Sequence, residues 1–209
     1  MYKNLSYLIK HSAIILVILF FVRICFAIAF VPMSIISSNL TVLPRLLFNS
    51  LRFDVQVVCY VLLLPTVLTF VFAALRKPWT ERVLSRFRRL YFSIVCALLL
   101  AISGIDMGFY ANFNSHINLT FFDFFNEGPM SLIQTIWEEY HCVYEAIAFL
   151  LILLPILLLI RRIELGKSSA RNALHSTSRQ QPSRLKVIKL SATILLYIAF
   201  LVIGLRGSV

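Results

Sequence analysis

Six polar or ionisable residues that lie within or beside long apolar stretches are the strongest candidates for chemistry in this chain. They are Arg23, Arg52, Asp54, Asp106, Tyr110 and His116. A charged side chain inside a lipid bilayer is costly, so it usually faces the interior of a helix bundle and either pairs there or forms a functional site. We expect the five residues from Arg52 onward to line a polar pocket at one face of the membrane. Structural ion pairs that fix helix packing are the alternative.

Arg23 is an isolated cation inside the first apolar stretch, and it requires a partner. At 1.5 Å per residue, it lies about 16 Å along a helix that enters the bilayer near residue 12, whereas Asp106 lies about 24 Å along the third stretch. An arginine side chain can cover much of the remaining gap of about 8 Å. We therefore expect an intramembrane ion pair between Arg23 and Asp106, with Asp54 as the rival partner.

The elements that must position these residues are long and apolar. The chain is 60% hydrophobic and only 14% charged, whereas about a quarter of the residues in a soluble domain are charged. Five stretches approach the roughly 20 apolar residues that a membrane-spanning helix needs. They cover approximately residues 12–31, 55–75, 90–110, 143–160 and 190–205. We predict an all-α membrane protein, with residues 1–209 forming a single domain and a five-helix transmembrane bundle.

The positions of the basic residues predict the orientation of the bundle. Sixteen of the 20 lysines and arginines lie in the N-terminal segment and in the two loops that follow the second and fourth stretches. Short loops rich in lysine and arginine stay on the cytoplasmic side. We therefore expect a multi-pass protein of the cytoplasmic membrane, with its N-terminus inside and its C-terminus outside. The same distribution, in blocks between apolar runs, argues against nucleic-acid binding despite a net charge of +11.

Two connecting segments have distinct compositions. Residues 117–140 are aromatic and are broken by Gly128 and Pro129, which predicts two short helices in the outer membrane interface. A plain loop with aromatic anchors is the alternative. Residues 161–189 are basic and nearly free of acid, so we expect a solvated cytoplasmic linker beside an anionic leaflet.

Two sequence stretches resemble a known family. LRFDVQVVCYVLLLP and ISGIDMGFYANFNSHIN, followed by an aromatic segment that ends in EEYH, resemble the N-terminal membrane region of lipoteichoic acid synthase-like proteins. Those proteins are phosphoglycerol and phosphoethanolamine transferases of the sulfatase/alkaline phosphatase superfamily. The resemblance covers nearly the whole chain. It implies a catalytic domain outside the membrane that uses a threonine or similar nucleophile and a divalent metal to move a phospholipid headgroup.

The chain departs from that family at its end, because it stops at GLRGSV, where the catalytic domain is expected to begin. Its outer segments also lack a cluster of aspartate, histidine and threonine. We therefore expect no catalytic residue, metal ligand or cofactor in this chain, and a divalent metal only in the absent catalytic domain. By the same resemblance, the five pocket residues become candidates for binding a lipid headgroup.

Three functions fit these features. The first is the membrane domain of a phospholipid-headgroup transferase, with membrane phospholipid and an extracytoplasmic catalytic domain as partners. The second is a stand-alone small transporter or lipid-binding protein, for which internal repeats are typical, and none is present. The third is a purely structural anchor, which would tolerate replacement of Asp54 and Asp106.

Overall fold

The computed structural model describes residues 2–75, 79–118, 130, 142–174 and 184–206. These ranges contain six helices and no strand. The helices are α1 (Tyr2–Phe30), α2 (Met33–Ser38), α3 (Leu43–Leu75), α4 (Thr80–Phe113), α7 (Cys142–Leu174) and α8 (Arg184–Arg206). The interfacial helices expected within residues 117–140 fall almost entirely outside the described residues.

Four of the helices are long and apolar enough to cross a bilayer. Their apolar portions are Asn4–Phe30, Leu43–Ala73, Thr80–Phe113 and Ala146–Glu164. The apolar part of α8, Ala192–Arg206, is shorter. The chain is therefore an all-α, multi-pass membrane protein with at least four candidate spans.

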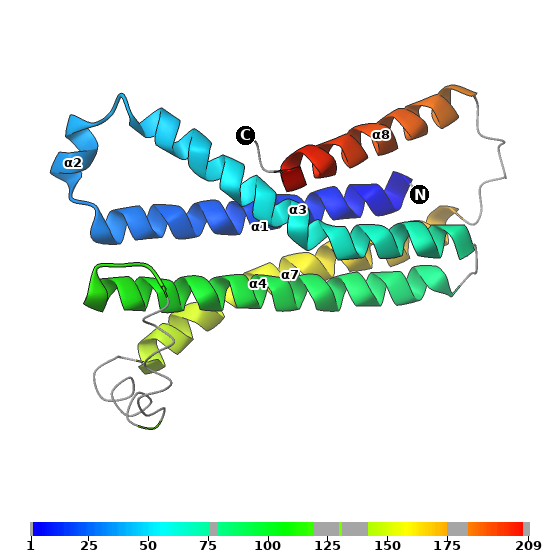
Figure 1. Ribbon diagram of the computed structural model, residues 1–209. Coiled ribbons are helices and arrows are strands. Elements are labelled where there is room, and N and C mark those ends of the chain that lie inside the picture. Colours follow the sequence, from blue (N-terminus) through cyan, green and yellow to red (C-terminus); the bar gives the residue numbers. More distant parts are fainter. Residues whose placement is uncertain (1, 76–78, 119–129, 131–141, 175–183, 207–209) are drawn as a thin grey trace.

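The long helices lie side by side and define two ends of a bundle (Figure 1). α1 packs against α3, α4 and α7, and α4 also packs against α3 and α7. α8 packs against α3. We call the end where α1 and α4 begin the N-terminal end, and the end where α1 and α4 finish the Asp106 end. At the Asp106 end, α2 and the first turns of α3 diverge from α1 (Figure 1).

Each long helix extends beyond the apolar stretch that predicted it. α1 begins at Tyr2 and α3 at Leu43, whereas residues 12 and 55 were expected. α3 and α4 contain 33 and 34 residues, which is about 50 Å of helix against about 30 Å of hydrocarbon. The expected boundaries marked only the most apolar part of each helix, and α1 continues until Pro32 interrupts the helical chain.

The basic segment after the fourth stretch is partly helical. α7 continues without interruption to Leu174, so residues 161–174 extend the helix that crosses the membrane. α8 begins at Arg184, which makes the last residues of the expected linker helical as well. Residues 175–183 of that linker lie outside the described part of the chain.

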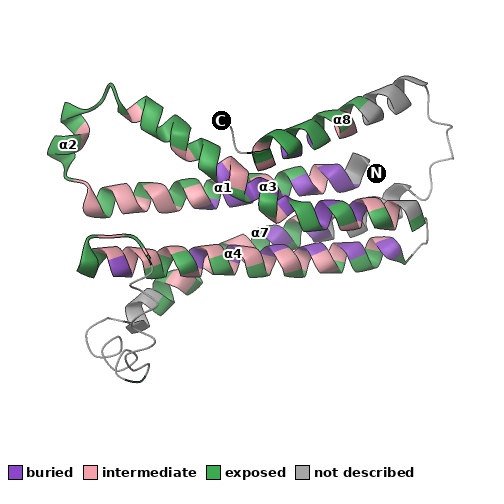
Figure 2. Cartoon of the chain, viewed as in Figure 1, coloured by how far each residue is buried: buried purple, intermediate pink, exposed green. Residues whose placement is uncertain are grey.

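Burial follows the contacts between helices (Figure 2). The apolar core contains Ile15 and Ile18 of α1, Leu62 of α3, Phe92 of α4 and Ile160 of α7. Large apolar side chains elsewhere on the same helices are exposed. In a bilayer these exposed side chains contact lipid, because lipid tails are as apolar as the side chains themselves.

α8 is joined to α3 through small and polar contacts. The hydroxyl groups of Thr66 and Tyr197 lie 2.8 Å apart and share a hydrogen bond in a buried position. Gly204 faces Cys59 so closely that a β-carbon at Gly204 would collide with the cysteine sulfur. Close approach of this kind through a small residue is typical of helix pairs in membranes.

Candidate polar sites at the two ends of the bundle

Arg23 forms an ion pair with Asp54, and this pair joins α1 to α3. Arg23 Nη2 donates a hydrogen bond of 2.7 Å to Asp54 Oδ1. The Asp54 side chain is 8% exposed and the Arg23 side chain 40% exposed. Arg23 Nε is buried and has no hydrogen-bond partner among the described residues. One side of the pair is therefore accessible, and the guanidinium retains a donor beyond the one that binds Asp54.

This geometry corrects the expected pair between Arg23 and Asp106. The rival partner, Asp54, takes the arginine, because α3 packs against α1 and brings Asp54 within hydrogen-bond distance. Both oxygens of Asp106 have partners that follow it closely in the chain. The position of a residue along its helix is a weak guide to its ion-pair partner. It takes no account of partners that follow the same helix, such as His116 and Ile117 for Asp106.

The partners of Asp106 come from the chain reversal after α4. Asn114 adopts the left-handed conformation, with φ of 51°, and caps α4 through its backbone N–H, which donates to the Tyr110 carbonyl. Asparagine tolerates this conformation better than most residues, so it suits the end of a helix. The reversal places His116 Nδ1 2.8 Å from Asp106 Oδ2. The backbone N–H of Ile117 donates to Asp106 Oδ1 at 2.9 Å.

Aromatic rings from α1 and α4 contact the His116 ring. Phe26 stacks on His116 with ring centroids 5.1 Å apart, and Tyr110 lies 5.2 Å from the same ring. Phe26 and Phe30 both meet the Tyr110 ring edge-on, at 4.8 and 4.9 Å. We call Phe26, Phe30, Asp106, Tyr110 and His116 the Asp106 cluster. Its polar members are accessible, because the side chains of Asp106 and His116 are 26% and 64% exposed.

The structure brings together part of the predicted pocket. Asp106, Tyr110 and His116 lie in one cluster, and Asp54 lies on the neighbouring helix with Arg23 as its partner. Arg52 lies on α3 two residues before Asp54, and its side chain is exposed. α1 contributes to both groups, because Arg23 pairs with Asp54 of α3 and Phe26 contacts Tyr110 and His116.

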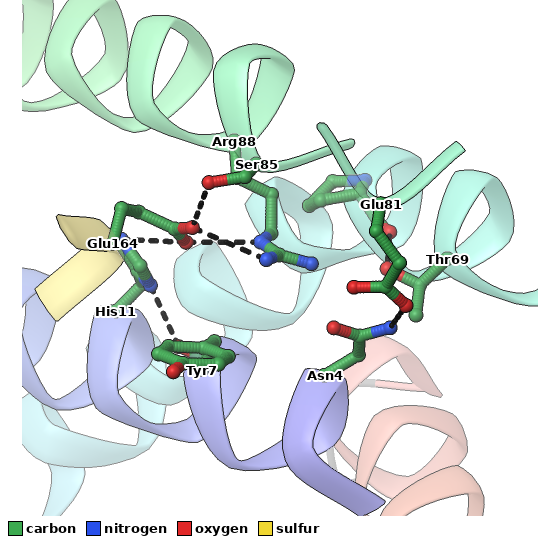
Figure 3. A network of polar contacts seen from close by, with 9 residues as sticks. Asn4, Tyr7, His11, Thr69, Glu81, Ser85, Arg88 and Glu164 are labelled. Carbon is green, nitrogen blue, oxygen red and sulfur yellow. Dashed lines mark hydrogen bonds and ion pairs between the residues drawn. The ribbon is translucent and has the colours of Figure 1, made fainter. Parts of the chain in front are cut away.

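A second polar site lies at the N-terminal end of the bundle, and the sequence did not predict it (Figure 3). Arg88 of α4 binds Glu164 of α7 through two hydrogen bonds, Nε to Oε1 at 3.0 Å and Nη2 to Oε2 at 3.2 Å. Ser85 donates a further hydrogen bond of 2.7 Å to Glu164 Oε2. The Arg88 and Glu164 side chains are both 0% exposed.

α1 completes this site with His11. His11 Nε2 lies 3.9 Å from Glu164 Oε1, and the imidazole stacks on Phe92 with ring centroids 4.3 Å apart. We call His11, Ser85, Arg88 and Glu164 the Glu164 cluster. Beside it, Arg88 lies over the Tyr7 ring at 5.4 Å. Nearer the beginning of α1, Asn4 donates a hydrogen bond of 3.0 Å to Glu81 (Figure 3).

The sequence carries two signals for the Glu164 cluster. Ser85, Arg88 and Phe92 recur at the spacing of one helix face. Glu164 is the only acidic residue after Glu145, and it stands in a segment rich in arginine and lysine. A lone carboxylate in such a segment has many possible cationic partners, so a buried pair was a reasonable candidate.

No group of three or more His, Cys, Asp or Glu side chains within the described ranges is placed to hold a metal ion. Arg23 with Asp54, and His116 with Asp106, form donor and acceptor pairs. Such pairs can orient a charged ligand.

No family model, curated protein or solved structure matches this chain.

Proposed function

We propose that this chain is the membrane domain of a phospholipid-headgroup transferase of the lipoteichoic acid synthase-like kind. In this proposal it crosses the cytoplasmic membrane five times, with α8 as the fifth span and short interfacial helices between α4 and α7. The Asp106 end faces outward and presents a phospholipid to an extracytoplasmic catalytic domain. The residue patterns around Asp54 and Asp106, described above, support the family, and the distribution of basic residues supports the orientation.

The observation that carries the headgroup proposal is the pairing of two accessible donors, Arg23 and His116, with carboxylates. Asp54 holds Arg23, and Asp106 holds His116. A phosphate group is bound by several N–H donors held in fixed positions, and charge-assisted hydrogen bonds are the strong ones. The two carboxylates would position the donors. The exposed part of Arg23 and, in the protonated imidazole, Nε2 of His116 would donate hydrogen bonds to the phosphate oxygens.

The alternative functions receive less support from these contacts. A purely structural anchor needs no accessible donors, and the Asp106–His116 pair joins residues only 10 positions apart in the chain. Such a local pair contributes little to holding different helices together. Internal repeats are typical of transporters, and the sequence contains none.

Retention of phospholipid by the purified protein tests the headgroup proposal. Native mass spectrometry of protein released from lipid nanodiscs should show one bound phospholipid per chain. Retention should fall severalfold in Arg23→Gln and in Asp106→Asn, because each change removes or misplaces a donor. Arg86→Gln is the matched control, since it removes an exposed arginine from the N-terminal end. The proposed headgroup site would be refuted if all four proteins retained equal amounts of phospholipid, or if the wild type retained none.

Transfer in cells tests the enzymatic part of the proposal. Cells that lack this chain should move less labelled glycerol phosphate or ethanolamine phosphate from membrane lipid to the envelope. The wild-type gene should restore transfer, and Asp106→Asn should restore less. Unchanged transfer in the deletion strain would argue against a role in headgroup transfer while leaving lipid binding intact.

Reporter fusions test the orientation. A fusion after Lys167 should report a cytoplasmic position, and a fusion after Val209 should report an external one. An external position at Lys167 would show that the bundle has the opposite orientation. A cytoplasmic position at Val209 would show that α8 does not cross the membrane.

A further inference from the structure

His11 is the one titratable member of the Glu164 cluster whose proton can be exchanged near neutral pH. The residue is 1% exposed, and its ring lies between α1, α4 and α7. Its Nδ1 is 2.6 Å from the Tyr7 carbonyl. A carbonyl only accepts hydrogen bonds, so Nδ1 carries the hydrogen. In the neutral ring Nε2 is then a bare acceptor, and it has no hydrogen-bond partner among the described residues.

Charged groups from each neighbouring element face this ring. Glu164 lies 3.9 Å away on α7, and Arg88 lies on α4, bound to the same carboxylate. On α1 itself, Tyr7 accepts the Nδ1 hydrogen bond, while exposed Lys10 lies over the Tyr7 ring at 5.8 Å. Arg88 and Glu164 already balance each other's charge.

A proton on His11 would disturb this balance. The cluster would hold two cations and one carboxylate, all of them buried, and a net buried charge is strongly unfavourable. The carboxylate already receives two hydrogen bonds from Arg88 and one from Ser85. The distance of 3.9 Å also exceeds that of a hydrogen bond, so Glu164 offers His11 no close partner in this arrangement. The packed state therefore favours neutral His11.

We propose that His11 is the proton-binding site of an acid-sensitive latch that holds the first turns of α1 against α4 and α7. At neutral pH the uncharged ring stacks on Phe92 and the latch is closed. At acid pH the imidazolium is stable only where it reaches water. Proton uptake then favours conformations in which the N-terminal turns of α1 detach, and the hydrogen bond between Asn4 and Glu81 breaks with them.

The sign of the pH dependence follows from linkage. The open state binds a proton at the ordinary value for histidine, about pH 6.5, whereas the closed state resists it. Stability of the closed latch is therefore fully present above about pH 6.5 and declines as the pH falls below that value. The open state gains at most about tenfold for each pH unit, because one proton is taken up.

Hydrogen–deuterium exchange of the intact protein in lipid nanodiscs measures the latch directly. Protection of the amides of residues 5–15, corrected for the intrinsic effect of pH on exchange, is compared between pH 7.5 and pH 5.5. In the wild type we expect protection to fall by up to about tenfold across this range. Amides of α3 near Leu62, in the apolar core, serve as an internal reference, and their corrected protection should not change.

Three variants identify the responsible residue. His11→Phe keeps a ring on Phe92, and His11→Gln keeps a donor for the Tyr7 carbonyl, but neither can take up a proton. Both should lose the pH response, so either one suffices if the other fails to fold. His116→Phe changes the histidine at the opposite end and should keep the response. Each of three results would overturn the latch proposal: an unchanged pH response in the His11 variants, no response in the wild type, or greater amide protection of residues 5–15 at acid pH.

Discussion

The two polar sites contain similar residue types, yet they differ in burial and in what they connect. The Arg88–Glu164 pair is fully buried and joins two helices whose residues are 76 positions apart. The Asp106–His116 pair is partly exposed and joins residues 10 positions apart. A buried pair loses its hydration and must be satisfied by the protein, whereas an exposed pair keeps access to water and to ligands.

This difference separates the roles of the two sites. Breaking the buried pair leaves an uncompensated charge, so the Glu164 cluster should control stability. Changing the exposed pair leaves groups that water can solvate, so the Asp106 cluster should control binding with little effect on stability. The Arg23–Asp54 pair lies between these extremes, because one partner is buried and the other is partly exposed.

Glu164→Gln should have the largest effect on stability. It leaves Arg88 charged and without its carboxylate at a site that is 0% exposed, and loss of one partner of a buried pair costs about 3–5 kcal/mol. Unfolding in mixed detergent micelles would measure the change. The double variant Arg88→Met with Glu164→Leu should recover most of the loss, because it removes both charges. A loss below about 1 kcal/mol in the single variant would show that the pair is not buried.

Gly204→Ala should have the next largest effect, and it tests a contact that involves no charge. The added β-carbon collides with Cys59, and overpacking of this kind costs about 1–3 kcal/mol. Gly104→Ala is the matched control, since a β-carbon there meets no atom within 4 Å. The control should be neutral or stabilising by up to about 1 kcal/mol, because alanine favours helix over glycine. Equal effects at the two glycines would contradict close packing of α8 on α3.

The Arg23–Asp54 pair should give an intermediate coupling energy. A double-mutant cycle with Arg23→Leu and Asp54→Leu should show about 1 kcal/mol of coupling, because the pair is partly screened. The cycle with Arg23→Leu and Asp106→Leu should be additive within about 0.5 kcal/mol, as for residues without a shared contact. If Arg23 were coupled to Asp106 instead, the result would support the Arg23–Asp106 pair predicted from the sequence.

The sequence could predict the helices because their signal is local. A run of apolar residues defines a candidate span whatever its neighbours are. All five stretches therefore coincide with helices of the structure, except that α1 ends at Phe30, one residue before the end of the first stretch. Two helix beginnings were placed too late, near residues 12 and 55 instead of Tyr2 and Leu43, because polar and charged residues interrupt the apolar pattern in those first turns.

The pairing of charged residues was harder to predict, because it depends on which helices touch. Arg23 had two possible partners, and only the packing of α1 on α3 selects Asp54. Asp106 depends on the chain reversal at Asn114, which a hydropathy pattern does not show. Arg88 and Glu164 lie among many basic residues and therefore resemble a solvated segment.

The most direct test of the division between the two ends measures lipid retention and stability on the same two variants. His116→Ala removes an exposed ring at the Asp106 end, so it should change the unfolding free energy by less than about 1 kcal/mol and reduce retained phospholipid severalfold. Glu164→Gln should do the reverse: it should lose about 3–5 kcal/mol and retain the wild-type amount of phospholipid per folded molecule. Full lipid retention in His116→Ala, or an equal loss of lipid in Glu164→Gln, would show that binding and stability are not divided between the two ends.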